Sequence, residues 1–118
     1  MGYAARPRLL REGPLHTVMW TFKVPEGTPK TNLIDTIKGT AHTYQGIPGL
    51  IRKYYGIAAD GSSLVGIYLW ESQAAANAFY TDDWVEMVTK RWAAPPQRQE
   101  WETPMVVESA EQRLVAAE

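Results

Sequence analysis

One lysine and two tyrosines are placed where their side chains could act together. Lys53, Tyr55 and Tyr68 lie in two β-favouring segments on either side of the dipeptide Asp60-Gly61, which is a strong hairpin turn signal. Counting outward from that turn pairs Lys53 with Tyr68 and puts all three side chains on one face. A lysine ammonium there can stabilise a substrate phenolate or enolate. We predict these three residues as catalytic, with each tyrosine acting as acid, base or hydrogen-bond donor.

Arg52 is a further catalytic candidate, because charged residues in the middle of a strand are uncommon unless they are paired or functional. The same register puts Arg52 on the face opposite Lys53, toward a neighbouring subunit. Either cation could stabilise a substrate anion. The structural alternative is that the charge pairs with Glu100 or Glu102 on a neighbouring strand, or extends to solvent along an apolar stem.

Large aromatic residues form the predicted substrate-binding set, in which a glycine leaves room for a ligand. The residues are Trp20, Tyr44, Gly66, Trp70 and Trp84. Any one of these aromatics could simply fill the core. As a set they favour a flat polyphenolic or quinonoid ligand, because buried indole N–H and hydroxyl groups need partners. An open cavity at these residues would support an enzyme, and a filled core would argue against one.

Composition excludes several other kinds of site. The 118 residues include no cysteine, which rules out disulfides, thiolate metal sites and cysteine nucleophiles. His16 and His42 lie on separate predicted elements without a carboxylate cluster, so we expect no metal. The net charge of -1 indicates no basic surface of the kind that binds nucleic acids. No apolar run reaches the roughly 20 residues that span a bilayer, and we expect a cytoplasmic protein.

The periodicity of apolar residues predicts one α+β domain. Thr28 is the expected N-cap of the first helix, with Pro29 at its first position, and Ser72 and Thr81 are expected to cap the next two. Pro104 should place the last strand at an edge or in a bulge. The predicted elements are a strand at 16–24, a helix to about Tyr44, the hairpin strands, a short helix ending near Phe79, a helix from Asp82 to about Trp92, and a strand at 98–108.

This order predicts a ferredoxin-like fold, in which a four-stranded antiparallel sheet carries helices on one face. Met19, Ile67 and Leu69 make the second face too apolar for open water, so we expect a face-to-face homodimer. The domain should span residues 16–108. Residues 1–15 should form a flexible arm, and residues 109–118 a tail that is either a short helix or disordered.

The segment PGLIRKYYGIAADGSSLVGIYLWESQAAANAF, from Pro48 to Phe79, resembles the dimeric α+β barrel superfamily. The similarity is to its small monooxygenases of the YdhR-like and antibiotic-biosynthesis kinds, in which a PGL strand, a GIYL strand and a WES helix start follow in this order. By element order the resemblance extends from about Thr17 to Val107. It implies a dimeric barrel. The superfamily includes cofactor-independent quinone-forming monooxygenases, polyketide cyclases, lactone isomerases and heme-degrading enzymes.

The heme-degrading branch can be tested on individual positions. Trp70 matches the tryptophan that those enzymes place over the porphyrin. Trp20 and Thr89 stand where that branch has an asparagine and a histidine, so heme degradation is not expected.

The resemblance and the aromatic residues together favour a cofactor-independent monooxygenase that uses O₂ on an aromatic or polyketide-like small molecule. No cofactor is expected. A cyclase or isomerase using the same pocket for enolate chemistry is one alternative. A non-catalytic small-molecule-binding protein is another.

Overall fold

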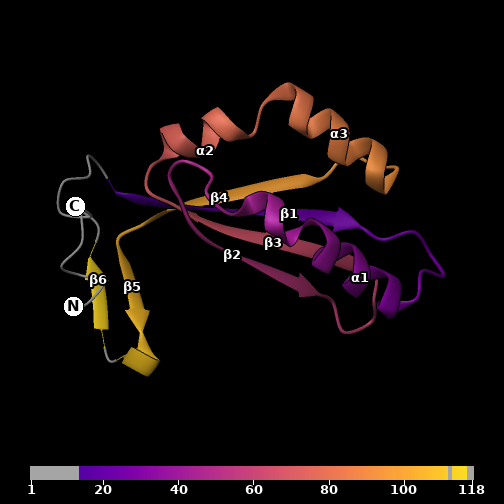
Figure 1. The fold of residues 1–118 in the computed structure, drawn as a ribbon, viewed down its shortest axis with the longest axis horizontal. Helices are drawn as coiled ribbons and strands as arrows, with labels where there is room; N and C mark the ends of the chain where they lie inside the picture. The colour runs from indigo at the N-terminus through magenta and orange to yellow at the C-terminus, as the bar shows by residue number, and fades with distance from the viewer. Residues whose placement is uncertain (1–13, 112, 117–118) are drawn as a thin grey trace.

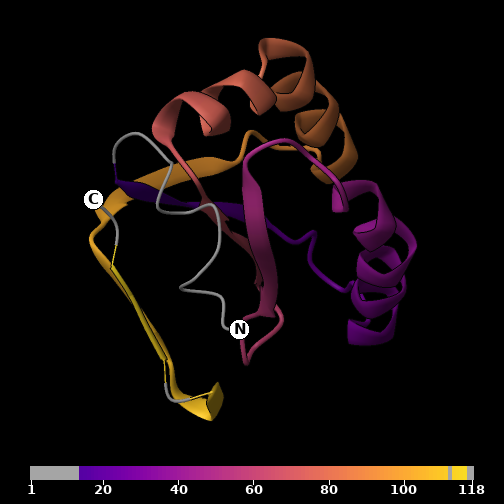
Figure 2. The same cartoon turned by 60° about the vertical axis from the view of Figure 1, so that its left-hand side comes forward.

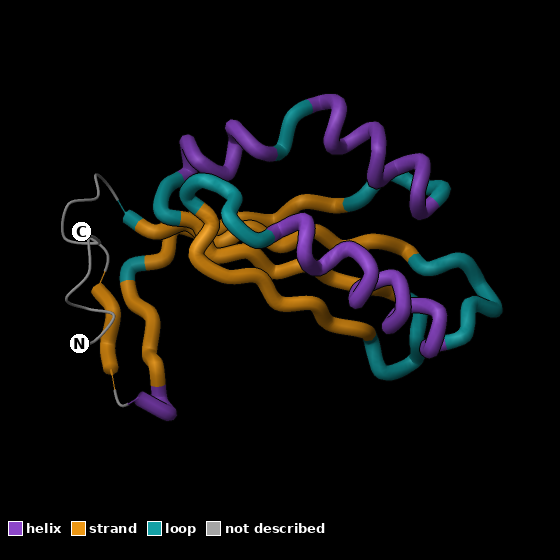
Figure 3. The backbone as a smooth tube through the Cα atoms, in the orientation of Figure 1, coloured by secondary structure: helices purple, strands orange, loops and turns teal. Residues whose placement is uncertain are grey.

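The protein folds around one antiparallel sheet that is covered by helices on a single face. We describe a computed structural model that covers residues 14–111 and 113–116. The strand order is β2-β3-β1-β4, and the helices lie together on one side (Figures 1 and 3). This confirms the predicted fold class. The elements of this layer are β1 (Leu15–Lys23), α1 (Lys30–Thr40), the 3₁₀ helix η3 (Ala41–Tyr44), β2 (Leu50–Ile57), β3 (Ser63–Trp70), α2 (Gln73–Phe79), α3 (Asp82–Trp92) and β4 (Gln97–Thr103).

The core lies between the helices and the sheet. Along β1, Val18, Trp20 and Phe22 are buried in one cluster, as strand alternation predicts. Each helix adds at least one buried apolar residue: Leu33 from α1, Ala76 from α2, and Trp84 and Val88 from α3. The burial of these side chains fixes the helices on the sheet and supplies most of the driving force for folding.

The β2–β3 hairpin keeps the predicted register where the candidate residues lie. Lys53 pairs with Tyr68 and Tyr55 with Gly66. A tight two-residue turn at Asp60-Gly61 would need a positive φ at both residues, but only Gly61 has one, at 75°. The Asp60 carboxylate instead accepts hydrogen bonds from the backbone N–H and hydroxyl of Ser62.

The start of β2 departs from the prediction. A bulge between Leu50 and Arg52 makes Leu50, and not Ile51, the partner of Trp70. The extra residue turns the Ile51 side chain to the opposite face, where it packs beside Leu69.

Side chains cap two of the three helices as predicted. The Ser72 hydroxyl accepts from Ala75 N at 3.0 Å, and the Thr81 hydroxyl accepts from Trp84 N at 3.1 Å. The predicted cap at Thr28 is wrong. Pro29 is the N-cap of α1, and the Thr28 hydroxyl donates to the Pro25 carbonyl.

The predicted final strand, residues 98–108, is divided at Pro104. Proline has no N–H to donate to the ladder, and the chain leaves the main sheet there. Beyond it, β5 (Met105–Glu108) pairs with β6 (Arg113–Ala116) across a 3₁₀ turn, η4 (Ser109–Glu111). This hairpin extends away from the sheet, on the side opposite the helices (Figure 2). The predicted tail therefore contains a strand, and most of the predicted arm, residues 1–13, lies outside the described residues.

The second face of the sheet is only partly covered. Leu15 and Leu69 are buried there beside Ile51 and Val106 of β5. Tyr54 and Trp101 remain 55% and 48% exposed. None of the described helices is both long and apolar enough to cross a membrane.

Candidate functional site

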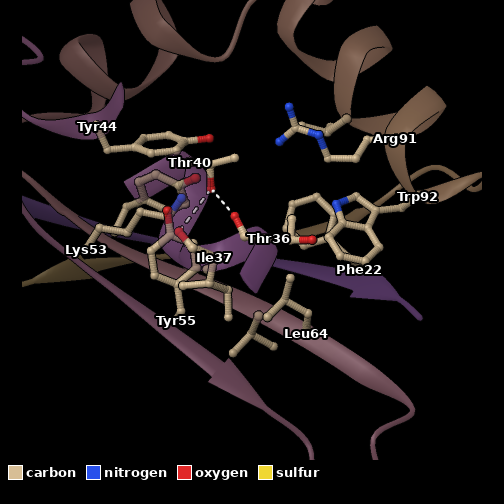
Figure 4. Close-up of a pocket in the computed structure, with 14 residues that line it drawn as sticks. Phe22, Thr36, Ile37, Thr40, Tyr44, Lys53, Tyr55, Leu64, Arg91 and Trp92 are labelled. Atoms are coloured by element: carbon tan, nitrogen blue, oxygen red, sulfur yellow. Dashed lines mark hydrogen bonds between the residues drawn. The ribbon is translucent and has the colours of Figure 1, made fainter. Parts of the chain in front are cut away.

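A narrow cleft lies between α1, α3 and the helix-facing side of β2 and β3 (Figure 4). It holds about 400 Å³ of empty space including its solvent-open mouth, and about 30 Å³ of this can be occupied by the centres of water-sized molecules. A single water needs roughly 10–15 Å³ by that measure, so the inner part has room for about two waters, and a ligand ring must displace side chains at the mouth to reach Lys53. Of the predicted site residues, the structure brings Lys53, Tyr55, Tyr68, Gly66 and Tyr44 together here.

Lys53 stands at the centre of this cleft and is enclosed by aromatic rings. Its Nζ lies 3.3 Å from the centroid of the Tyr44 ring, 4.1 Å from that of Tyr55 and 4.6 Å from that of Tyr68. No carboxylate of the described residues forms an ion pair with it. The amine is thus held by ring faces and has little contact with water.

Burial, together with the nearby positive charge of Arg91, lowers the pKa of Lys53 from 10.5 to about 7. The three ring faces oppose this shift, because their quadrupoles attract the ammonium form. With a pKa near 7, part of the amine population is still neutral at pH 7, and that fraction can accept a proton.

The Tyr55 hydroxyl is a buried polar group without a hydrogen-bond partner among the described residues. The Thr40 hydroxyl lies on the same side of the cleft, but its proton is directed to the backbone carbonyls of Thr36 and Ile37 (Figure 4). Burial raises the pKa of Tyr55. The phenol is therefore a neutral donor whose nearest protein acceptor is the Thr40 hydroxyl oxygen, and a ligand oxygen can replace it.

Gly66 provides the close approach that Tyr68 and Lys53 need. A Cβ at this position would lie 3.1 Å from Tyr68 Cε1 and 3.4 Å from Lys53 Cε. Tyr68 is almost fully buried, and burial raises its pKa far above the ordinary value for a phenol. Tyr68 is thus suited to act as a wall or hydrogen-bond donor and not as a base.

Arg91 is a cleft residue that the sequence did not reveal. It lies in the last turn of α3, and its side chain lies across the opening from Tyr44 (Figure 4). Thr40, Phe22 and Trp92 also line the cleft. The available signal was helical spacing, because Arg91 follows the buried Val88 by three residues and so shares its face of α3.

The three predicted tryptophans occupy a packed core and do not line this cleft. Trp20, Trp70 and Trp84 are each less than 10% exposed and contact one another through the rings of Tyr80 and Phe79. The indole N–H of Trp70 donates to the Tyr80 hydroxyl at 3.0 Å. The aromatic set is therefore split between a filled core and an open cleft, and we retain only the cleft residues as site candidates.

Arg52 lies on the opposite face of the sheet, as the register predicts. Its guanidinium pairs with both carboxylate oxygens of Glu108 in β5, and this contact raises the pKa of Arg52. Arg52 does not reach the cleft. Through this ion pair, Arg52 connects the β5–β6 hairpin to the main sheet.

The two histidines are also separate from the cleft. His16 Nε2 lies 2.7 Å from Glu100 Oε1, and this hydrogen bond, with the nearby Arg98 guanidinium, lowers the pKa of Glu100. Glu100 is thus paired on β4 and is not a partner for Lys53. His42 is exposed on η3. No group of three or more potential metal-binding side chains occurs among the described residues.

Solved structures share this architecture at low sequence identity. The monooxygenase ActVA-Orf6 of Streptomyces coelicolor, solved with nanaomycin D, superposes with a TM-score of 0.58 at 20% identity, covering 86% of this chain and 94% of its own. SnoaB, a cofactor-independent oxygenase from Streptomyces nogalater, gives 0.58 at 17% identity, covering 81% and 99%. Protein SO0527 from Shewanella oneidensis gives 0.61 at 12% identity, covering 79% and 94%.

The chain has the fold of these solved structures. No family model and no curated protein matches it. The shared fold agrees with the resemblance carried by the Pro48–Phe79 segment.

Proposed function

We propose that the protein is a cofactor-independent monooxygenase that oxidises an electron-rich aromatic small molecule with O₂. The observation that carries this proposal is the Lys53 amine, held against three aromatic rings at a solvent-open cleft with a pKa lowered to about 7. Its fold is also that of a cofactor-independent oxygenase. In this proposal Lys53 is the base, Tyr55 and Tyr68 are hydrogen-bond donors, and Tyr44 is a wall.

The first step is removal of a proton from an acidic C–H or O–H of the substrate by the neutral amine of Lys53. A base whose pKa lies near the working pH combines a useful neutral fraction with a useful proton affinity. The anion that forms gains the Lys53 ammonium as a neighbouring positive charge, and the unpartnered Tyr55 hydroxyl can donate to its oxygen.

The second step uses O₂ as the only oxidant. For a substrate with an acidic CH₂ group, the carbanion gives one electron to O₂, and the two radicals combine to form a C–O bond. The peroxide takes up a proton. Loss of the remaining C–H proton then breaks the O–O bond, leaving one oxygen as a carbonyl and releasing the other as water. The protein contributes proton transfer, orientation and anion stabilisation.

Anthrone is a suitable probe, because it reacts with one O₂ to give anthraquinone and one water. We expect the protein to raise the rate of O₂ consumption above the buffer rate, with one ¹⁸O from ¹⁸O₂ in the quinone. Lys53→Met should lower this rate by at least about 100-fold, within the range for loss of a general base. Lys90→Met is the matched control, because Lys90 is exposed on α3. Wild-type turnover in Lys53→Met would refute the assignment.

Incubation under nitrogen distinguishes the oxygenase from a cyclase or isomerase that forms the same enolate. Only the oxygenase should stop. A protein that only binds its ligand should gain thermal stability with that ligand and give no product by mass spectrometry.

We also propose that two copies pack through the second face of the sheet. The exposed rings of Tyr54 and Trp101 on that face support this arrangement, since large exposed aromatics favour interfaces. Light scattering coupled to size-exclusion chromatography should give a dimer mass for the wild type and a monomer mass for Trp101→Glu. A monomeric wild-type protein would contradict it.

A further inference from the structure

The cleft carries the positive charge of Arg91, and that of Lys53 when its amine is protonated, without a compensating negative side chain among the described residues that line it. Lys53 and Arg91 both line it, and no Asp or Glu is among the described residues that do. The remaining polar groups at the cleft are hydroxyls, including the partnerless hydroxyl of Tyr55. A neutral hydrocarbon ligand would leave all of these groups unused. The charge distribution instead fits a ligand that brings negative charge to the mouth.

Arg91 is the cation that is free to meet such a ligand. Its side chain is exposed, and it forms no ion pair with any described carboxylate. Lys90 is a neighbour in the same helical turn, but it pairs with Glu86 at 3.9 Å and does not line the cleft. Both residues share the favourable interaction of a cation with the C-terminal end of α3. The difference between the two residues is that Arg91 lines the cleft and Lys90 does not.

We infer that the cleft takes an acidic aromatic molecule, whose carboxylate or other anionic group binds the Arg91 guanidinium while its ring enters between Tyr44 and Trp92. This inference rests on the proposed function and names the substrate class of the same site. The guanidinium presents paired N–H donors that match a carboxylate in a fixed geometry. Arg91 is a specificity residue in this arrangement, and the reacting atoms lie deeper, beside Lys53.

The bound anion would also act on the base. The groups that face Lys53 are Tyr55 on β2, Tyr68 on β3, Tyr44 on η3 and Arg91 on α3. Arg91 carries the one formal charge of this set. A substrate anion that neutralises Arg91 removes a repulsion and so raises the proton affinity of Lys53 when the correct substrate is in place. Recognition and base strength are thereby linked.

The test compares two probes of nearly equal shape, 1-hydroxy-2-naphthoate and its carboxamide. Binding is measured under nitrogen by quenching of tryptophan fluorescence and confirmed by equilibrium dialysis. We expect the acid to bind roughly tenfold more tightly than the amide, the scale of a charge-assisted contact at a solvent-open site. Arg91→Gln should remove this preference, because it weakens acid binding much more than amide binding. Arg91→Lys should retain part of it, and Lys90→Gln all of it. Added salt should weaken only acid binding.

Equal binding of acid and amide by the wild type would overturn the inference. So would a preference that survives in Arg91→Gln, or no binding of the acid at millimolar concentration. Failure here is distinguishable from failure of the proposed function, because binding is measured without O₂. If the protein prefers the acid to the amide but does not oxidise anthrone, the proposed oxygenase activity is refuted and the proposed anion-binding role of Arg91 is supported. If the protein oxidises anthrone but binds acid and amide equally, the oxygenase activity is supported and the anion-binding role of Arg91 is refuted.

Discussion

The Nζ atom of Lys53 lies 3.3 Å from the centroid of the Tyr44 ring. The two residues belong to different layers, since Lys53 is on β2 in the sheet and Tyr44 ends the 3₁₀ helix η3 after α1. Their contact therefore depends on how α1 packs on the sheet. It brings a lysine with a lowered pKa against an aromatic ring at a cleft that is open to a ligand.

The rate of anthrone oxidation should depend on the protonation of Lys53. In the free enzyme kcat/KM should rise with pH, with an apparent pKa near 7, and reach a plateau above it. Arg91→Gln should move this midpoint upward, because it removes a positive charge that lowers the pKa. A pH–rate profile for each variant checks this. An unchanged midpoint in Arg91→Gln would contradict the Coulomb coupling.

Lys53 should also cost stability at low pH. Its folded pKa of about 7 lies below the unfolded value of 10.5, so between these values the unfolded chain binds more protons and stability rises with pH. Below about pH 7 the full penalty of a buried charge applies. Lys53→Met should therefore raise the free energy of unfolding by ~3 kcal/mol near pH 6 and by much less near pH 10, after the ring faces offset part of the burial cost. Urea denaturation at both pH values measures this difference.

Gly66→Ala should disturb the cleft by moving Tyr68 and Lys53. The added Cβ would stand 3.1 Å from Tyr68 Cε1, which is too close without adjustment. We expect about 1–2 kcal/mol of destabilisation and a lower oxidation rate. Gly39→Ala is the control, because a Cβ there meets nothing within 4 Å and Gly39 lies inside α1. That change should stabilise the protein by up to about 1 kcal/mol. Equal activity in the two variants would argue against the packing role of Gly66.

Tyr80→Phe should reveal the tryptophan cluster as a structural core. It removes the acceptor of the buried Trp70 indole N–H, and an unsatisfied buried donor costs about 1–3 kcal/mol. We expect lower resistance to urea with an unchanged KM for anthrone. If the variant is fully folded and its KM for anthrone still changes greatly, the tryptophan cluster takes part in substrate binding.

Arg52→Gln should loosen the C-terminal hairpin and leave the chemistry intact. The residue pairs with Glu108 on the face away from the cleft. Faster hydrogen exchange in β5, with oxidation within about twofold of wild type, is the expected outcome. A loss of activity comparable to that of Lys53→Met would show that Arg52 takes part in the reaction.

The positions that the sequence predicted best depend on local rules. The caps at Ser72 and Thr81 follow from one hydroxyl and the nearest helix N–H groups. The pairing of Lys53 with Tyr68 follows from the length of the hairpin turn, because both residues lie only a few positions from that turn. Strand alternation then put Lys53, Tyr55 and Tyr68 on one face before any contact was known. These local rules did not predict the bulge between Leu50 and Arg52, because the position of a bulge depends on the residues that pack against each face of the strand.

The sequence by itself determined the order of the elements up to β4, the hairpin register around Lys53 and the side of the sheet on which each strand candidate lies, because these follow from periodicity and short-range hydrogen bonding. Only the tertiary structure decided which aromatics fill the core and which border the cleft. Trp70 and Lys53 share a face of the sheet, yet Phe79 of α2 and Tyr80 pack on Trp70, while Lys53 and Arg91 line the cleft that is open to solvent. Helix packing is a sum over many distant contacts, and no short segment of sequence contains it.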